Sequence, residues 1–366
     1  MNEHELAILH RFCLDAEPAS CTPYGCGHIN RTYLVATAGG RCYILQKINH
    51  HTFRDVAGLM ENIELVTEHL RRKSPDPRSV LTLIRTKDGK SYLEADDGYW
   101  RVFRFVEDSI CLQQPESDAD FYESAVGFGT FQQLLSDFPA EKLHETIPNF
   151  HNTPDRYRAL LETLTRDPMH RAAQVQPEIE FALARQAEMA TLQNALDAGE
   201  LPLRVTHNDT KLNNVLFDAK TRRALCIIDL DTVMPGSALY DYGDSIRFGA
   251  ATAAEDEREL DKMEMSLERF RVFTRGYVRA CPGLTQKELE LLPLGAKVMT
   301  MECGVRFLTD HIDGDNYFSI HREGQNLDRA RTQFKLVADM ERKWDKMKEI
   351  VNEEVQNAKE NGSCCI

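Results

Sequence analysis

The stretch VTHNDTKLNNVLF at Val205–Phe217, followed by CIIDLDT at Cys226–Thr232, is the most informative part of this chain. It holds Asp209, an Asn five residues later, and Asp229 directly after an apolar, β-prone run. Phosphoryl-transfer sites use this set: a loop Asp accepts the proton of the acceptor hydroxyl, and an Asn and a later Asp hold Mg²⁺. The pattern predicts Asp209 as the catalytic base and Asn214 and Asp229 as metal ligands.

The same residues also have a plain structural explanation, because Asp and Asn are common in turns between strands. The Asp that follows the run at 224–228 favours the catalytic interpretation. Asp231 lies two residues after Asp229, so on an extended segment both side chains would point the same way. Asp231 is therefore predicted to support the metal directly or through water, with capping of the turn at Pro235 and Gly236 as the alternative.

HNDTKLNNVLFD and IIDLDTVMPGSALYDYGDSIRFGA resemble the aminoglycoside phosphotransferase and choline kinase superfamily, in which H-x-D-x-x-x-x-N precedes an Ile-Asp strand end. The segments PYGCGHINRTYLV, YILQKIN, ENIELVT and MECGVRFL make the chain more similar to the bacterial N-acetylhexosamine 1-kinases. The resemblance runs from about Pro23 to Lys335. It implies an α+β, two-lobed, protein-kinase-like fold. It also implies ATP- and Mg²⁺-dependent phosphorylation of the anomeric hydroxyl of N-acetylglucosamine or N-acetylgalactosamine.

A chain of 366 residues is long enough for two lobes with separate cores. We expect a small β-rich lobe at residues 1–107 and a larger, mostly helical lobe at residues 108–366. In the first lobe, periodicity and turn signals predict a helix at 55–70 and strands at 32–38, 41–48, 80–86, 91–95 and 99–106. In the second, they predict a hairpin at 215–217 and 224–228 and helices from 118 onward, at 178–198, 284–310 and 326–355.

Two places in the first lobe are candidates for nucleotide binding. Gly25 and Gly27 precede the first long strand, where glycines let backbone N–H groups approach phosphates closely, although two glycines in a turn are also ordinary. Phe105 and Glu107 follow the last strand and are the expected hinge that reads the adenine edge. The alternative for that segment is a plain linker between the lobes.

The phosphate-binding Lys of the general kinase pattern is missing. Gln46 stands at its position on the third strand, and Lys47 should point to the opposite face because strand side chains alternate. Either Gln46 contacts phosphate as a neutral donor, or a shift in the register of the strand brings Lys47 to the position of the missing Lys. An ion pair with Glu61 or Glu64 on the next helix is then doubtful. Lys211 is a further candidate, placed to offset charge on the transferred group or simply solvated.

For the acceptor pocket, the resemblance points to His28, Phe248, Arg306 and Tyr317, together with Asp209. Phe248 would pack on the apolar faces of a sugar, and Arg306 would donate to hydroxyls as a planar fork. The alternatives are a turn residue for His28 and, for Arg306, an ion pair with Asp229 or a neighbouring Glu, because an Arg in an apolar helix needs an acceptor.

Composition excludes several classes. The net charge of −14 argues against nucleic acid as a partner. No apolar run approaches the roughly 20 residues needed to cross a bilayer. The N-terminus lacks a signal peptide pattern. None of the ten cysteines is spaced C-x-x-C, which favours reduced thiols, a cytoplasmic location and no zinc site. We expect a monomer.

Two competing interpretations stay open. Another small-molecule kinase of the same fold would act on an aminoglycoside, choline or homoserine, but a cationic acceptor favours carboxylates or aromatic boxes over Arg306. A nucleotide-binding pseudokinase draws slight support from Gln46. The presence of Asp209, Asn214 and Asp229 counts against it.

Overall fold

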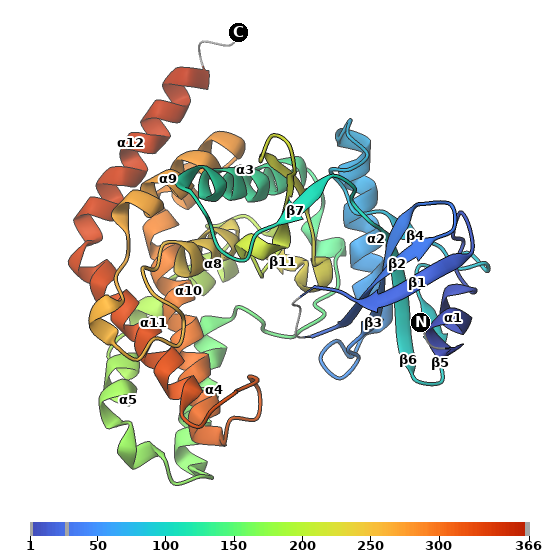
Figure 1. The fold of residues 1–366 in the computed structure, drawn as a ribbon. Helices are drawn as coiled ribbons and strands as arrows, with labels where there is room; N and C mark the ends of the chain where they lie inside the picture. Colours follow the sequence, from blue (N-terminus) through green and yellow to red (C-terminus); the bar gives the residue numbers. More distant parts are fainter. Residues whose placement is uncertain (1–2, 26–28, 363–366) are drawn as a thin grey trace. The chain divides into compact units, whose positions relative to one another are not determined.

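A computed structural model describes residues 3–25 and 29–362 (Figure 1). Its residues cluster into two compact units, each built from several segments. Unit 1 comprises Met1–Cys111, Asp137–Pro148 and Val215–Pro235, and unit 2 comprises Leu112–Ser136, Asn149–Asn214 and Gly236–Ile366. The N-terminal region is rich in strands and the C-terminal part is mostly helical, which confirms the expected α+β class.

Unit 1 is built on an antiparallel sheet with the strand order β1-β2-β3-β6-β4, to which β5 adds by pairing with β6. Apolar side chains on one face of this sheet form a core with the short helix α1, including Val35, Leu45, Trp100 and Val102. The elements are α1 (Glu3–Leu9), β1 (Pro18–Pro23), β2 (Arg31–Thr37), β3 (Cys42–Ile48), β4 (Leu83–Ile84), β5 (Leu93–Ala95) and β6 (Gly98–Arg104).

Helix α2 (Val56–Lys73) begins at Asp55, whose carboxylate caps it by accepting a hydrogen bond from the Gly58 N–H at 2.9 Å. It ends at Ser74, just before Pro75, which disfavours helical geometry in the residue before it. From the buried side of α2, the Asn62 amide donates to the carbonyls of His144 at 2.8 Å and Val233 at 3.0 Å. This amide joins three segments of unit 1 that lie far apart in the sequence.

A second sheet of unit 1 has the order β10-β9-β7. The predicted hairpin is confirmed as β9 (Val215–Asp218) and β10 (Ala224–Ile227), which pair antiparallel. Strand β7 (Ser109–Cys111), which the sequence pattern did not predict, pairs with the other edge of β9. The short strand β11 (Met234–Gly236) follows β10.

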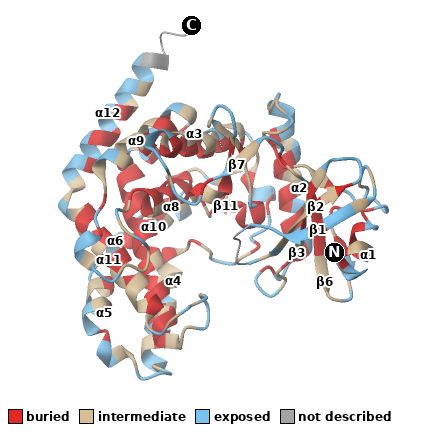
Figure 2. Cartoon of the chain, in the orientation of Figure 1, coloured by how far each residue is buried: buried red, intermediate tan, exposed pale blue. Residues whose placement is uncertain are grey.

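Unit 2 consists mainly of helices whose inward faces are buried (Figure 2). Helices α8 and α10 approach so closely that a Cβ on Gly243 would lie 2.3 Å from the carbonyl oxygen of Gly295. Helix α10 starts with a capping box between Thr285 and Glu288. The elements are α3 (Asp118–Leu134), α4 (Thr153–Arg166), α5 (Gln176–Leu183), α6 (Gln186–Met189), α7 (Thr191–Asp197), β8 (Arg204–Thr206), α8 (Ala238–Gly249), α9 (Leu267–Ala280), α10 (Gln286–Asp313), α11 (Gln325–Arg342) and α12 (Trp344–Gly362).

Two of the predicted helices are wrong in that each is interrupted in the structure. Residues 178–198 form parts of three helices. The first break lies where the Arg185 N–H bonds to Ala182 in a tightened turn, and the second lies at Ala190. Residues 326–355 are divided between α11 and α12 at Lys343, whose side chain reaches the Met265 carbonyl at 2.8 Å. Among the described residues, no helix is long and apolar enough to span a bilayer.

Candidate active site

The loop that follows β8 is held from below by a carboxylate on α8. The two oxygens of Asp241 accept the N–H groups of His207 at 2.9 Å and Asn208 at 2.7 Å. The Gln132 amide donates to the same carboxylate at 2.8 Å. Asn208 has a positive φ of 65°, a conformation that Asn tolerates better than most residues. Asp241, at 1% exposure, thus fixes the backbone immediately before Asp209.

A second carboxylate of α8 holds the other side of Asp209. Asp244 accepts the Thr210 N–H at 3.1 Å and the Arg247 Nε–H at 3.0 Å. Ser245 donates to the Thr210 carbonyl at 2.9 Å. Arg247 in turn contacts Glu255 at 2.7 Å. Both backbone neighbours of Asp209 are therefore tied to one helix, and through Arg247 to the segment that follows it.

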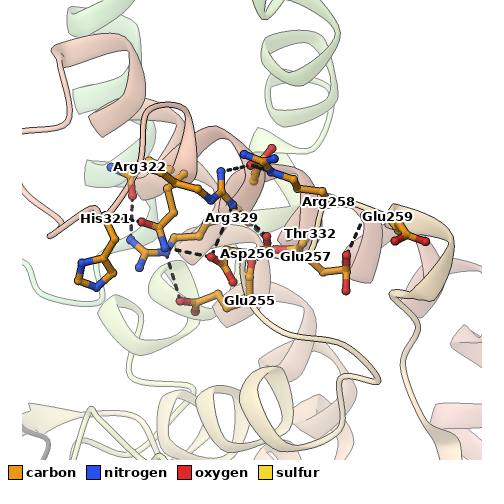
Figure 3. A network of polar contacts seen from close by, with 12 residues as sticks. Glu255, Asp256, Glu257, Arg258, Glu259, His321, Arg322, Arg329 and Thr332 are labelled. Carbon is orange, nitrogen blue, oxygen red and sulfur yellow. Dashed lines mark hydrogen bonds and ion pairs between the residues drawn. The ribbon is translucent and has the colours of Figure 1, made fainter.

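Glu255 belongs to a polar network outside the loop (Figure 3). Its backbone carbonyl accepts a hydrogen bond from Thr332, and its carboxylate lies 3.9 Å from Arg329. The next residue, Asp256, contacts Arg322 at 3.5 Å. These contacts hold the segment after α8 against α11 and against Arg322, which lies just before that helix. Because Glu255 belongs to this segment, the contacts also fix the partner that Arg247 has besides Asp244.

Three predicted site residues lie together in unit 2. Lys211 Nζ is 3.0 Å from one oxygen of Asp209, and the Asn214 amide donates to the other at 3.1 Å and to the Asp209 carbonyl at 2.8 Å. Burial alone would raise the pKa of Asp209, but the charge of Lys211 with its hydrogen bond, His207 and the Asn214 amide outweigh it and lower the pKa. The carboxylate is thus ionised and able to accept a proton.

The amide oxygen of Asn214 takes no part in these contacts. Its amide nitrogen is committed to Asp209, so the amide oxygen is directed elsewhere. In unit 1, Asp229 is exposed and has a positive φ of 57°. An amide oxygen and a carboxylate are hard donors of the kind that Mg²⁺ prefers. Within the described ranges, His, Cys, Asp and Glu side chains form no cluster of three that could hold a metal by themselves.

Asp231 differs from Asp229 in its surroundings. It is 3% exposed, and its two oxygens lie 2.6 Å from Arg101 Nη1 and 2.6 Å from the donating amide of Asn30. Arg101 is itself buried and donates through Nε to Gln46 at 2.9 Å. These contacts tie the segment after β10 to the main sheet of unit 1, so Asp231 has a bracing role whether or not it also supports a metal.

We expect Arg101→Lys to destabilise unit 1 by about 1–2 kcal/mol, because Lys keeps the charge beside Asp231 but loses the directed bond to Gln46. Urea unfolding in a Trp344→Phe background measures this, since Trp100 is then the only tryptophan and lies in unit 1. Arg158→Lys, at an arginine whose side chain is 65% exposed, is the control. An unchanged unfolding free energy for Arg101→Lys would contradict the bracing role.

The missing phosphate lysine is not restored by a shift in strand register. Gln46 pairs with Thr32 on β2 and with Arg101 on β6, and the Gln46 amide donates to the Thr32 hydroxyl at 3.1 Å. Lys47 lies on the other face of β3, 2.6 Å from Asp97 and over the ring of Trp100. Gln46 remains a predicted nucleotide contact, and its amide is already hydrogen-bonded at both ends inside unit 1.

The contacts of Asp97 make a pH-dependent contribution to stability. Burial opposes ionisation, but hydrogen bonds from Lys47, Trp100 and His4 outweigh it and lower the pKa of Asp97 from 3.8 to about 2. A lowered pKa stabilises the fold above the unfolded value, and this stabilisation disappears as the pH falls from about 4 to about 2. We expect Asp97→Asn to cost about 1 kcal/mol at pH 7 and almost nothing near pH 2. Unfolding at several pH values tests this, with the exposed Glu94→Gln as the control.

Of the other predicted nucleotide contacts, Gly25, Phe105 and Glu107 are described residues of unit 1. Gly25 has a positive φ of 79°, which suits glycine, whereas Gly27 and His28 fall outside the described residues. The Phe105 N–H bonds to the Cys42 carbonyl at 3.1 Å within the sheet, so it is not directed at a ligand. Glu107, two residues on, is exposed and remains the candidate hinge residue.

Two of the predicted acceptor residues contact each other. Arg306 on α10 donates to the Tyr317 hydroxyl at 3.3 Å, and its guanidinium lies 5.3–5.6 Å from the ring centroids of Phe150, Tyr317 and Phe318. Phe248 is half-buried on α8. The sequence pattern did not single out Phe150 or Phe318, because isolated aromatic residues give no signal of which side chain they will enclose.

The comparisons with known proteins agree with this arrangement. Residues 20–272 match the family model APH, described as the phosphotransferase enzyme family. The chain belongs to this family. The match includes the loop after β8 that carries Asp209, together with Asp229 and α8.

Solved structures of this fold are similar over nearly the whole chain. An aminoglycoside phosphotransferase from Alicyclobacillus acidocaldarius shares 12% identity with a TM-score of 0.56, covering 96% of both chains. An amicoumacin kinase in complex with AMP-PNP and Ca²⁺ shares 14% with a TM-score of 0.58, covering 92% of this chain and 93% of its own. A choline kinase from Cryptosporidium parvum Iowa II shares 12% with a TM-score of 0.54, covering 91% and 92%. The phosphotransferase described here thus has the fold of the small-molecule kinases.

Proposed function

We propose that this phosphotransferase transfers the γ-phosphoryl group of ATP to the anomeric hydroxyl of an N-acetylhexosamine, N-acetylglucosamine or N-acetylgalactosamine. The observation that carries the acceptor class is the surroundings of Arg306. A pocket for a cationic acceptor needs aromatic faces or carboxylates directed at the amine. Here three aromatic rings already surround a cation of the chain itself. A neutral polyol that accepts hydrogen bonds from a guanidinium fits this arrangement better than an amine does.

In the proposed reaction, the anomeric oxygen attacks the γ-phosphorus, and the bond from that phosphorus to the β,γ-bridging oxygen breaks. The bridging oxygen leaves with the electron pair as part of ADP. Asp209 orients the attacking hydroxyl and receives its proton late in the step. Lys211 lies beside Asp209 and offsets negative charge in the same place.

We propose Asn214 and Asp229 as the protein ligands of Mg²⁺, with Asp231 bracing the segment that carries Asp229. When bound, the metal would neutralise negative charge on the phosphate groups. The amicoumacin kinase was solved with a nucleotide analogue and Ca²⁺, which supports a divalent cation in a relative of the same fold. Gly25, Gly27, Gln46, Phe105 and Glu107 remain the proposed nucleotide contacts. His28, Phe248, Arg306 and Tyr317 remain the proposed acceptor contacts.

³¹P NMR of the purified protein with Mg-ATP and separate acceptors tests the proposal. The expected result is a new sugar 1-phosphate signal with N-acetylglucosamine or N-acetylgalactosamine, and none with choline, homoserine or an aminoglycoside. The methyl glycoside of the same sugar should be inert because its anomeric oxygen is blocked. The 6-deoxy sugar should react, because that change leaves the anomeric hydroxyl in place.

Two outcomes would overturn the acceptor assignment, and a third would overturn the kinase activity itself. Phosphorylation of the methyl glycoside would place the reaction at another hydroxyl. Consumption of ATP only with an amine-bearing acceptor would support a kinase activity but would show that the acceptor is not an N-acetylhexosamine. Nucleotide binding without turnover on any acceptor would favour the pseudokinase.

A further inference from the structure

A buried histidine contacts the residue immediately before Asp209. His151 is 9% exposed, and its Nε2 lies 3.1 Å from the backbone carbonyl oxygen of Asn208. Its other ring nitrogen, Nδ1, lies 2.7 Å from Glu302 on α10. The Asn208 carbonyl can only accept, so Nε2 carries the proton of that hydrogen bond. His151 therefore bridges Glu302 on α10 and the backbone of the loop that carries Asp209.

Glu302 is fixed by more than the histidine. It is 1% exposed, and the Thr153 hydroxyl donates to its second oxygen at 2.6 Å. Burial opposes ionisation of this carboxyl, but the charge of His151 and its hydrogen bond, with contributions from Arg306 and Thr153, lower its pKa. An ionised, fully bonded Glu302 sets the position of the imidazole, which in turn sets the position of the Asn208 carbonyl.

The backbone around Asn208 needs such support. Asn208 has a positive φ, and Asp241 and His151 hold opposite polar groups of the same residue: Asp241 accepts its N–H and His151 donates to its C=O. A residue whose N–H and C=O are both bonded to buried side chains has its peptide orientation fixed on both sides. The next side chain along the chain is Asp209, so this orientation determines where its carboxylate points.

We infer that His151, held by Glu302, is a positioning residue that orients the Asp209 carboxylate through the Asn208 carbonyl. The inference rests on the proposed role of Asp209 as base. Nothing in the sequence pattern singled out His151 or Glu302, because their partners lie 57 and 151 residues from His151 along the chain.

Two amide variants of different length separate the two contacts of the ring. The amide nitrogen of Gln reaches about as far as Nε2, and that of Asn about as far as Nδ1. His151→Gln therefore retains a donor for the Asn208 carbonyl, and His151→Asn retains only a donor for Glu302. We expect kcat of His151→Asn to fall about 10- to 100-fold, the scale on which misplacing a catalytic group by about 1 Å acts. His151→Gln should stay within about threefold of the wild type, and the KM for ATP should change in neither.

Amide hydrogen exchange in the absence of substrate gives a second readout that does not require turnover. Exchange in the peptide 205–214 should rise in His151→Asn and stay near the wild-type rate in His151→Gln. Glu302→Gln should also raise it. Glu354→Gln is the matched control, because the Glu354 carboxylate is 1% exposed, as that of Glu302 is, and also has a cationic partner. It lies on α12 and contacts Arg275 on α9. It should lower the melting temperature without changing exchange in the 205–214 peptide.

The outcomes separate this inference from the proposed function. If no acceptor is phosphorylated by the wild type, the proposed function fails, and the exchange comparison still decides whether His151 orients the loop. If His151→Asn keeps the wild-type kcat per folded molecule in an active enzyme, the inference is overturned. It is also overturned if both variants lose activity equally or if exchange in the 205–214 peptide rises equally in both, because the bond to Asn208 is then not the decisive contact.

Discussion

Asp209→Asn should reduce kcat about 10²- to 10⁴-fold, the range that a positioned general base contributes. The substitution keeps the side-chain volume and one oxygen, so the hydrogen bond from Asn214 is retained. It removes the proton acceptor and the partner of Lys211. The loss should therefore appear in turnover, while the dissociation constant for MgATP changes little.

Steady-state turnover by ³¹P NMR and calorimetric titration with MgATP measure these two quantities on the same preparation. Asp345→Asn is a suitable control, since that carboxylate is 94% exposed on α12. Full activity in Asp209→Asn would rule out Asp209 as the base. A proportional loss of nucleotide affinity would instead assign it to nucleotide binding.

Asp241→Asn should destabilise unit 2 by about 3 kcal/mol and abolish activity. Each oxygen of Asp241 accepts at least one N–H group: Oδ1 accepts that of Asn208, and Oδ2 accepts those of His207 and Gln132. Whichever way the new amide is turned, its NH₂ faces a donor. At least one buried N–H then loses its acceptor, and the loop before Asp209 loses its support.

Thermal unfolding followed by the helical circular dichroism signal, together with turnover at a temperature where the variant is folded, tests this expectation. Asp339→Asn provides a matched comparison, because Asp339 is 3% exposed and accepts the Met265 N–H at 2.7 Å, outside the loop that carries Asp209. It should lower stability without a comparable loss of kcat per folded molecule. Retained activity in folded Asp241→Asn would show that the loop does not need this carboxylate.

Local patterns predicted much of the fold. The alternation of side chains on β3 and the apolar face of α2 identify these elements, because burial on one face imposes a period of two on strands and of 3.6 on helices. Continuity is harder to predict. The pattern across 178–198 is helical throughout, yet a tightened turn at Arg185 interrupts it, and such a break has no strong compositional signal.

The site shows the same division. Asp209 and Asn214 are five residues apart, so the spacing alone indicates that they can meet, and they do. Arg101 is the contrasting case, because its partners lie far away in the sequence. Its side chain contacts Gln46, 55 residues earlier, and Asp231. An isolated Arg in an apolar strand indicates only that a partner exists. Which acidic residue it meets follows from strand register and the path of the chain.

The way the chain is divided between the two units has a practical consequence for dissecting the protein. The polypeptide passes from one unit to the other at Cys111/Leu112, Ser136/Asp137, Pro148/Asn149, Asn214/Val215 and Pro235/Gly236. No single cut therefore separates the units, and a fragment ending near residue 111 would lack the two later segments whose carbonyls the Asn62 amide binds. Truncated versions for crystallisation or binding assays should misfold. Isolating the first unit would require a redesigned chain that joins its three segments with new linkers.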